Sequence, residues 1–253
     1  MQVYYMSGAG NDFAVMDVRD QKVDLQSLAL RLCKQTGADG FLALDHSDCA
    51  HFRLHFYNAD GLRGEMCGNG ARCICRFAYD LGIAPAEMTV QTDAGIVYGW
   101  RLSEDTYKVK LNDPSIIDLS RTENAAYIEL GDPGVPHSIT QLPRLEFEDA
   151  QELRPLAFSL RHHPAFPKGV NANLYTRLSD DRIRILTYER GVEDYTLACG
   201  TGCACVAVTL QKKGLLPGGK LTCENRGGIL TVDLSDAGIF LTGPTEILNI
   251  FTI

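Results

Sequence analysis

The most constraining feature of the sequence is an internal repeat. Residues 67–85, CGNGARCICRFAYDLGIAP, align without a gap with residues 199–217, CGTGCACVAVTLQKKGLLP. Each residue of the first copy corresponds to the residue 132 positions later in the second. The copies share a cysteine, two glycines, a second cysteine, a later glycine and a proline, and both continue into two strand-like runs separated by glycine. Such self-similarity predicts that the chain folds as two related halves.

Each copy predicts a helix that begins at a glycine-rich turn. A glycine lies where the helix C-cap belongs, and a proline follows that prevents continuation: Gly82 and Pro85 in the first copy, Gly214 and Pro217 in the second. Cys67 and Cys199 are therefore expected at two equivalent helix N-termini.

The remainder of the chain is mostly short strand-like runs, at 52–58, 106–111, 182–188, 239–243 and 246–253. Two further amphipathic helices are predicted. One covers Asp24 to Gln35 with Leu25, Leu28 and Leu32 on its apolar face, and the other covers Ala150 to Arg161 with Leu153, Leu156 and Leu160. The pattern indicates the α+β class.

A segment of Asn, Asp, Pro and Ser residues at 111–118 lies between strand-like runs and marks the expected boundary between the halves. We predict a first half over 1–114 and a second half over 115–239. Because the second copy ends before the last strands, residues 240–253 are expected to return to the first half.

Composition excludes several classes of protein. The 253 residues are 45% hydrophobic, and 24 Lys and Arg against 32 Asp and Glu give a formal charge of -8. No long basic run is present, so we expect a small-molecule partner and no nucleic acid. The N-terminus lacks an export signal and no apolar segment reaches 18 residues, which predicts a cytoplasmic protein without a membrane partner.

The nine cysteines form an odd set that does not suggest a disulfide framework. A free cysteine is ordinarily a small buried hydrophobic residue, and we keep that interpretation for Cys33, Cys49, Cys75, Cys203 and Cys223. Cys73 and Cys205 also recur, but six residues into the predicted helices they are expected to pack. No zinc-binding spacing occurs around Cys67, so no metal is predicted.

Position distinguishes Cys67 and Cys199. A helix N-terminus favours a thiolate, which predicts pKa values drawn toward neutrality, and glycines at 68, 70, 200 and 202 would let a carboxylate approach the backbone amides. Pseudo-symmetry could set the two thiols facing each other in a cleft. Inverting a stereocentre by proton transfer needs an acid and a base on opposite faces of one carbon, and two thiols meet that need.

No cofactor is called for by this scheme. The chain shows no dinucleotide-binding GxGxxG after a strand and no P-loop lysine, and no pyridoxal-type lysine stands out.

At MCGNGARC (66–73) and ACGTG (198–202) the chain resembles the diaminopimelate epimerase family, which interconverts L,L- and meso-diaminopimelate in the lysine and peptidoglycan pathway. Further signatures of that family occur in order along nearly the whole chain: GAGNDF (8–13), GADG (37–40), FYNADG (56–61), GVPH (134–137), FPKGVNAN (166–173) and YERG (188–191).

The resemblance implies an isomerase in which Cys67 and Cys199 form the catalytic pair. It places Asn11, Gly68, Asn69, Gly200 and Thr201 around the reacting amino-acid head, and Asn58, Asn171, Glu189 and Arg190 as further substrate-binding residues. His137 would orient the cleft. The chemistry agrees, since arginine can grip a distal carboxylate and glutamate can accept from an ammonium. Turn formation is the rival explanation for Asn11 and Asn58.

The resemblance also implies two similar domains, each a β-structure wrapped around a central helix, with the active site in the cleft between them. It further implies a C-terminal tail returning to the first domain, a cofactor-independent reaction and a homodimer.

Three departures from the family pattern leave the substrate open. The chain has GVEDYTLACGTG (191–202), Val135 before the Pro-His pair, and Arg63. A racemase of another amino acid, such as histidine, is therefore the alternative. A proline racemase-like enzyme is disfavoured by Asn69, and a non-catalytic binding or thiol-redox protein by the matched thiols.

Overall fold

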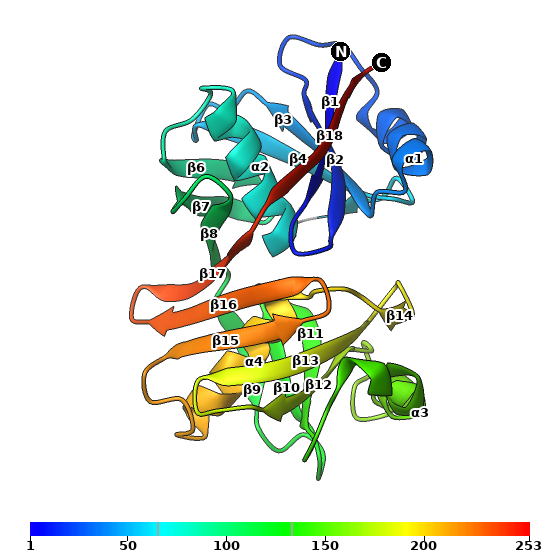
Figure 1. The fold of residues 1–253 in the computed structure, drawn as a ribbon, viewed down its shortest axis with the longest axis vertical. Coiled ribbons are helices and arrows are strands. Elements are labelled where there is room, and N and C mark those ends of the chain that lie inside the picture. Colours follow the sequence, from blue (N-terminus) through cyan, green and yellow to red (C-terminus); the bar gives the residue numbers. More distant parts are fainter. Residues whose placement is uncertain (65, 133) are drawn as a thin grey trace. The chain divides into compact units, whose positions relative to one another are not determined.

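The structure is a computed structural model and describes residues 1–64, 66–132 and 134–253. The chain forms two compact units (Figure 1). Unit 1 comprises Met1–Lys110 and Thr242–Ile253, and unit 2 comprises Leu111–Leu241. Each unit is a mixed β-structure with two α-helices, which confirms the predicted α+β class.

Unit 1 contains the first and last strands of the chain. Its elements are β1 (Gln2–Ser7), β2 (Asp12–Asp17), α1 (Leu25–Thr36), β3 (Gly40–Asp45), β4 (Phe52–Asn58), β5 (Arg63–Gly64), α2 (Gly68–Asp80), β6 (Glu87–Thr92), β7 (Gly95–Arg101), β8 (Thr106–Leu111) and β18 (Glu246–Thr252).

Unit 2 repeats this order. Its elements are β9 (Pro114–Asp118), β10 (Ala126–Leu130), β11 (Val135–Gln141), the short 3-10 helix η1 (Phe147–Asp149), α3 (Ala150–Arg161), β12 (Asn171–Arg177), β13 (Arg182–Glu189), β14 (Asp194–Tyr195), α4 (Gly200–Lys212), β15 (Lys220–Asn225), β16 (Gly228–Ser235) and the first part of β17 (Gly238–Pro244), whose last three residues belong to unit 1. The segment 111–118, expected to separate strands, therefore contains a strand of its own, β9, which pairs with β10.

The two units share one topology. In each, two parallel strands flank the first helix, β2 with β3 around α1 and β11 with β12 around α3. A second parallel pair flanks the later helix, β4 with β6 around α2 and β13 with β15 around α4. Helices α2 and α4 are both 13 residues long and begin at Gly68 and Gly200, so the sequence repeat is also a structural repeat.

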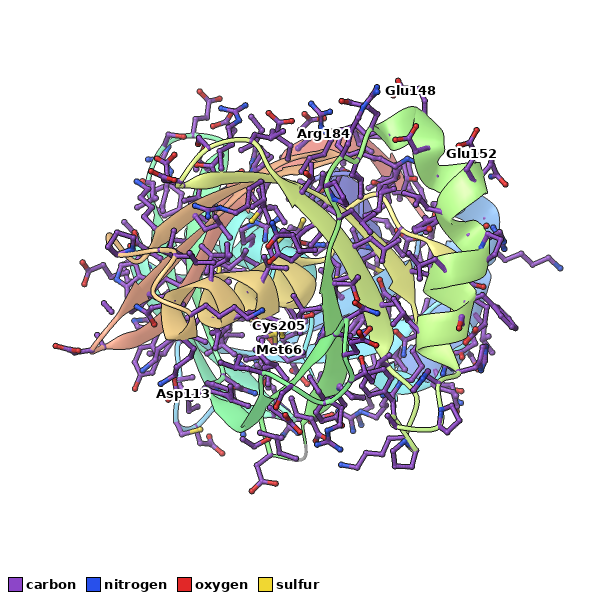
Figure 2. The ribbon with its side chains drawn as sticks, turned by 90° about the horizontal axis from the view of Figure 1, so that it is seen from below. Met66, Asp113, Glu148, Glu152, Arg184 and Cys205 are labelled. Atoms are coloured by element: carbon purple, nitrogen blue, oxygen red, sulfur yellow. The ribbon has the colours of Figure 1, made fainter. Side chains whose placement is uncertain are left out.

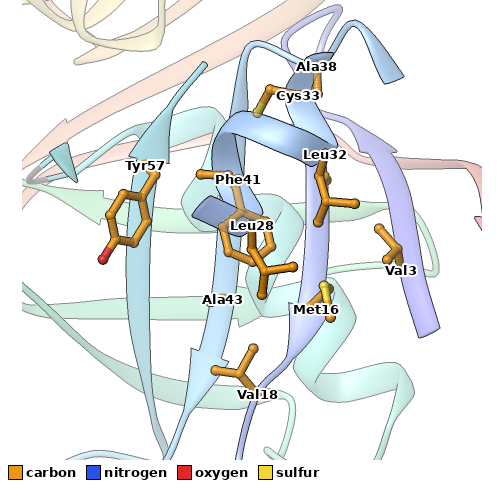
Figure 3. Close-up of a cluster of buried hydrophobic side chains, with 12 residues drawn as sticks. Val3, Met16, Val18, Leu28, Leu32, Cys33, Ala38, Phe41, Ala43 and Tyr57 are labelled. Carbon is orange, nitrogen blue, oxygen red and sulfur yellow. The ribbon is translucent and has the colours of Figure 1, made fainter. Parts of the chain in front are cut away.

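The helices of unit 1 cover opposite faces of its sheet. On one face, Leu28 and Leu32 of α1 join a buried cluster with Met16, Phe41 and other strand residues (Figure 3). On the other face, the first turn of α2 lies against Phe13 and Leu42. Because neighbouring strand residues point to opposite faces, these strands are apolar on both sides.

Local signals set the ends of α1. The side chain of Asp24 accepts from the backbone N–H groups of Gln26 and Ser27 at 3.1 and 3.4 Å, and Gly37 ends the helix with φ 76°. Capping by aspartate satisfies amides that the helix leaves unpaired, and glycine adopts the left-handed conformation without strain. The predicted helix and its apolar face are confirmed here.

The apolar face predicted for α3 is wrong at one position. Leu156 is 38% exposed, whereas Ala157 is completely buried together with Ala150 and Leu160. The buried residues follow a spacing of three and four that includes the half-buried Leu153, so Leu156 lies about 80° around the helix from the centre of this stripe.

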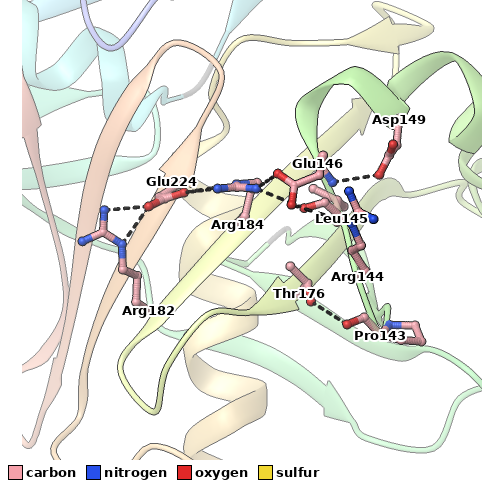
Figure 4. Close-up of polar contacts among 9 residues, drawn as sticks. All are labelled: Pro143, Arg144, Leu145, Glu146, Asp149, Thr176, Arg182, Arg184 and Glu224. Carbon is pink, nitrogen blue, oxygen red and sulfur yellow. Dashed lines mark hydrogen bonds and ion pairs between the residues drawn. The ribbon is translucent and has the colours of Figure 1, made fainter.

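A chain of ion pairs lies across the strands of unit 2. Arg182 and Arg184 of β13 both bind Glu224 of β15, at 2.6 and 3.1 Å, and Arg184 also binds Glu146 before η1 (Figure 4). These contacts join segments that are distant in sequence and hold the parallel β13–β15 pair in register.

The C-terminal strand completes unit 1. β18 pairs antiparallel with β1 from Gln2↔Thr252 to Ser7↔Glu246, with one irregularity after Tyr5. The two ends of the chain lie side by side, since Met1 N donates to Ile253 O at 2.9 Å and Ile253 N donates to Met1 O at 3.0 Å (Figure 1).

The first turn of helix α4 packs against a hydrogen-bonded asparagine of the sheet. Asn173 of β12 donates to His137 Nδ1 at 3.1 Å and to two backbone carbonyls, and its Oδ1 accepts from the Thr187 hydroxyl at 2.9 Å. A Cβ added at Gly202, in the first turn of α4, would lie 2.2 Å from that same Oδ1. Glycine is therefore the residue that lets α4 approach the strands closely.

We predict that Gly202→Ala lowers the free energy of unfolding by about 1–3 kcal/mol, because the added methyl must displace the Asn173 amide. Gly218→Ala is the matched control in the same unit, since its Cβ would meet nothing within 4 Å, and it should change stability by less than about 1 kcal/mol. Urea denaturation of the two variants checks this, and equal effects would contradict the close-packing argument.

The buried imidazole of His137 makes stability depend on pH. Burial lowers the pKa of His137 to about 3, and the positive charge of Arg190 acts in the same direction. His137 binds a proton below about pH 6.5 in the unfolded chain but stays neutral in the folded protein. The free energy of unfolding therefore falls as the pH drops below about 6.5, by about 1.4 kcal/mol per pH unit.

Replacing His137 by Gln should remove this contribution. The difference in unfolding free energy between about pH 6.5 and about pH 5 should be about 2 kcal/mol smaller in His137→Gln than in the parent protein. His46→Gln, at an exposed position, is the control and should keep the parent slope. Parallel pH profiles for the parent and His137→Gln would rule out the buried imidazole as the cause.

Candidate active site

Cys67 is the N-cap residue of α2. Its backbone is extended, with φ -131° and ψ 121°, and the residue is partly buried. The sulfur lies 3.6 Å from Asn11 Oδ1 and donates to it. The expected placement of Cys67 at a helix start is thus observed, and Asn11 is its direct neighbour.

The loop before β2 brings Asn11 to this helix start. Ala9 and Gly10 have φ values of 59° and 80°, and Gly8 N donates to Asn11 O at 2.9 Å, which closes a tight turn. A Cβ at Gly8 would lie 3.0 Å from Asn69 O, so the loop packs directly on the first turn of α2.

Four polar side chains extend from Cys67 through unit 1. Asn11 Oδ1 also accepts from Asn69 Nδ2 at 3.3 Å, and Asn69 Oδ1 accepts from Arg72 Nη2 at 3.0 Å. On the other side, Asn11 Nδ2 donates to Asp39 Oδ2 at 2.7 Å. Asn69 and Arg72 are buried, at 3% and 0% exposure.

The remaining predicted residues of unit 1 lie close to this group. Gly68 is buried at the start of α2, and its carbonyl accepts from Arg72 Nη1 at 3.3 Å. Asn58 is exposed at the end of β4, where its backbone closes a turn with Gly61 and Leu62. The next residue, Ala59, donates its N–H to Asp39 O at 3.0 Å, which links this turn to the partner of Asn11.

Cys199 occupies the equivalent N-cap position of α4, with φ -124° and ψ 104°. Its sulfur accepts from Gly202 N at 3.4 Å and lies 3.4 Å from the Thr201 hydroxyl. Gly200 is buried as the first residue of the helix. Three predicted residues therefore meet at one helix start.

The expectation that a helix N-terminus lowers the thiol pKa is wrong for Cys199. Burial, at 7% exposure, raises its pKa well above the ordinary value, and the negative charge of Glu189 acts in the same direction. The Thr201 hydroxyl and the Gly202 amide lower the pKa but do not outweigh burial. Desolvation opposes the charged form more strongly than two hydrogen bonds favour it.

Asn171 and Arg190 form a second group in unit 2. Asn171 Oδ1 accepts from Arg190 N at 2.8 Å, and Arg190 Nη1 donates to the carbonyl of Lys168 at 3.1 Å. Lys168 is itself held by Glu129, with Nζ 3.1 Å from each carboxylate oxygen. Asn171 is buried and Arg190 is exposed.

The other cysteines largely fit the expectation of packing. Six are buried, namely Cys33, Cys73, Cys75, Cys203, Cys205 and Cys223, and Figure 2 shows Cys205 on α4. Burial raises the pKa values of Cys73 and Cys75 to about 12, which makes them inert thiols. Cys49 contradicts the prediction because it is exposed, in the loop between β3 and β4.

Sequence reasoning did not single out Asp39, Arg72 or Asn173. Arg72 left one usable signal, since the equivalent position of the second repeat is Ala204, and an arginine on a buried helix face requires polar partners. Asp39 and Asn173 gave no comparable signal, because their roles arise from contacts with residues distant in sequence.

Within residues 1–64, 66–132 and 134–253, no group of three or more His, Cys, Asp or Glu side chains is arranged to hold a metal ion. Over the same described residues, no helix combines the length and apolar character needed to span a membrane.

Comparison with known proteins identifies relatives over nearly the whole chain. The family model for diaminopimelate epimerase matches residues 3–117 and 131–248. The diaminopimelate epimerase of Aquifex aeolicus is 35% identical and the alignment covers 96% of this chain and 94% of that protein. The diaminopimelate epimerase of Flavobacterium psychrophilum is 31% identical and is covered completely, as is this chain.

Solved structures share the fold at low sequence identity. A phenazine biosynthesis protein of the PhzF family from Bacillus anthracis superposes with a TM-score of 0.73 at 13% identity, covering 100% of this chain and 98% of that one. A hydroxyproline epimerase from Agrobacterium vitis gives 0.72 at 18% identity, with 100% and 90% coverage.

These matches confirm both the resemblance found in the sequence motifs and the two-unit α+β fold. The family model spans most of the chain, and relatives above 30% identity align along nearly its full length. Both findings indicate the same family. The chain belongs to the diaminopimelate epimerase family.

Proposed function

We propose that this protein converts L,L-diaminopimelate to meso-diaminopimelate without a cofactor, with Cys67 and Cys199 as the acid and base. The observation that carries the proposal is the matched placement of the two cysteines as N-caps of equivalent 13-residue helices. Membership of the family supports the reaction class. On this basis we also propose roles in lysine and peptidoglycan synthesis, a cytoplasmic location and a homodimer.

The proposed reaction exchanges protons at one carbon. One sulfur, as thiolate, removes the α-proton and becomes a thiol, while the other thiol delivers its proton to the opposite face and becomes the thiolate. The substrate leaves with inverted configuration and no net change in protons. The reverse reaction uses the same groups in exchanged roles.

Hydrogen-bond donors near Cys199 suit this task. Burial disfavours the Cys199 thiolate, so this residue holds its proton until the reaction draws it away. The Gly202 amide and Thr201 hydroxyl then stabilise the sulfur anion, since both already lie 3.4 Å from it. Backbone amides at the two glycine-rich helix starts are proposed to hold the reacting carboxylate and stabilise the charge that develops on it.

Arg190 is proposed to bind the distal carboxylate. Its backbone N–H and its Nη1 are anchored to Asn171 and Lys168, so the guanidinium is oriented before substrate arrives. Because Asn171 Oδ1 accepts from that N–H, its Nδ2 group is the part that can donate to substrate. Glu189 is proposed to accept from the distal ammonium, and Asn58 is proposed as a further substrate-binding residue.

The alternative is a racemase of another amino acid in the same fold. Val135, at the start of β11, is 37% exposed, and its apolar side chain cannot donate a hydrogen bond to a polar substrate. A panel of amino acids that includes histidine separates the two functions, because only one should exchange its α-proton rapidly.

Replacing either cysteine of the proposed pair tests the two-thiol mechanism. In D2O the parent protein should incorporate deuterium at the α-carbon of diaminopimelate without added cofactor, and Cys67→Ala or Cys199→Ala should lower epimerisation by at least about 1,000-fold. Nuclear magnetic resonance of the substrate measures the exchange. Cys49→Ala removes an exposed thiol outside the proposed pair and should keep parent activity. Full turnover by Cys67→Ala or Cys199→Ala would refute the two-thiol mechanism.

Replacing Arg190 tests its proposed contact with the distal carboxylate. Arg190→Lys keeps the charge but loses the planar pair of donors, so KM for diaminopimelate should rise about 10-fold or more with a smaller change in kcat. Arg177→Lys, at an ion pair with exposed Asp180, is the control. If Arg190→Lys impairs a substrate that lacks the distal carboxylate equally, the assigned contact is wrong.

A further inference from the structure

The hydrogen-bond chain around Cys67 ends at a charged side chain on each side. Asp39 accepts from Asn11 Nδ2 at 2.7 Å, and Arg72 donates to Asn69 Oδ1 at 3.0 Å. Between these ends, Asn11 Oδ1 accepts from Asn69 at 3.3 Å and from the Cys67 thiol at 3.6 Å. All of these contacts lie within unit 1.

The two charges decide how the amides are oriented. A carboxylate can only accept, so the NH2 group of Asn11 must face Asp39 and its oxygen must face away. A guanidinium can only donate, so the oxygen of Asn69 must face Arg72 and its NH2 group must face Asn11. Rotating either amide by 180° would oppose two acceptors or two donors.

Asp39 is itself held firmly in place. Its Oδ2 also accepts from Asp12 N at 2.9 Å, its own N–H donates to Asp12 O at 2.9 Å, and its carbonyl accepts from Ala59 N at 3.0 Å. Arg72 is completely buried, and its Nη1 is anchored to Gly68 O at 3.3 Å. Both ends of the chain are therefore fixed by the backbone.

We propose that Asp39 and Arg72 are positioning residues that orient the Asn11 and Asn69 amides and thereby hold the Asn11 oxygen beside the Cys67 sulfur before substrate binds. The sulfur of Cys199 has different surroundings, because it accepts from the Gly202 amide. Ala204 stands at the position of the second repeat that corresponds to Arg72, so the arginine end of this chain is not repeated in unit 2. The importance of Cys67 rests on the proposed function, whereas the orientation of its neighbours does not.

Two substitutions of Asp39 separate its hydrogen bonds from its charge. Asp39→Ala removes the acceptor that holds Asn11 Nδ2, so the Asn11 oxygen is held only by Asn69 and Cys67 and the amide can move away from the sulfur. Asp39→Asn removes the charge but keeps an oxygen that can accept from both Asn11 and Asp12. Asp105→Ala is the matched control, because Asp105 is another exposed carboxylate that stabilises a turn of unit 1, bonded to Ser103 and Thr106.

The first measurement is the pH dependence of Cys67 alkylation by iodoacetamide, read from the Cys67 peptide by mass spectrometry. The Asn11 oxygen favours the protonated sulfur, so loosening this contact should lower the midpoint by about half a pH unit or more in Asp39→Ala and by clearly less in Asp39→Asn. The second measurement is kcat/KM for diaminopimelate, which should fall at least about 10-fold in Asp39→Ala and no more than about threefold in Asp39→Asn. Asp105→Ala should match the parent in both.

Two outcomes would overturn the inference. Asp39→Ala could match Asp105→Ala in both measurements, or Asp39→Asn could be as impaired as Asp39→Ala, which would make charge rather than orientation responsible. If the parent protein does not turn over diaminopimelate at all, the proposed function fails, and the alkylation midpoints alone then decide the inference.

Discussion

Close approach between a buried helix start and the sheet beneath it is the constraint on which both units depend. In unit 2 the approach requires Gly202, whose missing side chain leaves room for the Asn173 amide. In unit 1 the loop between β1 and β2 makes the corresponding close contact, since Gly8 lies against Asn69 in the first turn of α2. These contacts bring side chains from separate strands and loops to the two N-cap cysteines. If the helix start lay farther from the sheet, each cysteine sulfur would be near groups of its own helix alone.

The two units satisfy the polar groups at these starts in different ways. Unit 2 uses neutral groups, with the Asn173 amide, the Thr187 hydroxyl and a His137 ring that burial keeps uncharged. Unit 1 uses charged groups at the ends of a chain of amides, Asp39 and Arg72. A buried polar group costs free energy unless it is bonded. These contacts meet that need for the asparagine amides of both units, whereas His137 Nε2 is buried with no hydrogen-bond partner among the described residues. The consequence is that two cysteines at equivalent positions have unlike neighbours: a carbonyl oxygen for Cys67, and an amide and a hydroxyl for Cys199.

Much of the fold followed from local signals. The repeat predicted α2 and α4, and Asp24 and Gly37 mark the ends of α1 where the sequence placed that helix. Where prediction erred, a tertiary contact was responsible. Leu156 has the character of a core residue, yet Ala157 faces the sheet because the helix is rotated to bury Ala150 and Leu160. The thiol pKa expected from the dipole of α4 is overridden by burial of Cys199, which no local pattern measures.

The sequence by itself determined that there are two related halves, that a cysteine begins the central helix of each, and that the family is that of diaminopimelate epimerase. The first two conclusions depend on the repeated order of cysteine and glycine residues, and the third on motifs spread along the chain, all of which are visible in residue order alone. Only the tertiary structure decided that β18 pairs with β1, and that Asp39 and Arg72 orient the amides beside Cys67. The physical reason is that a strand pair or an oriented amide depends on partners brought from elsewhere in the chain. Asn11, Asp39 and Asn69 meet only after β2, β3 and α2 have packed together.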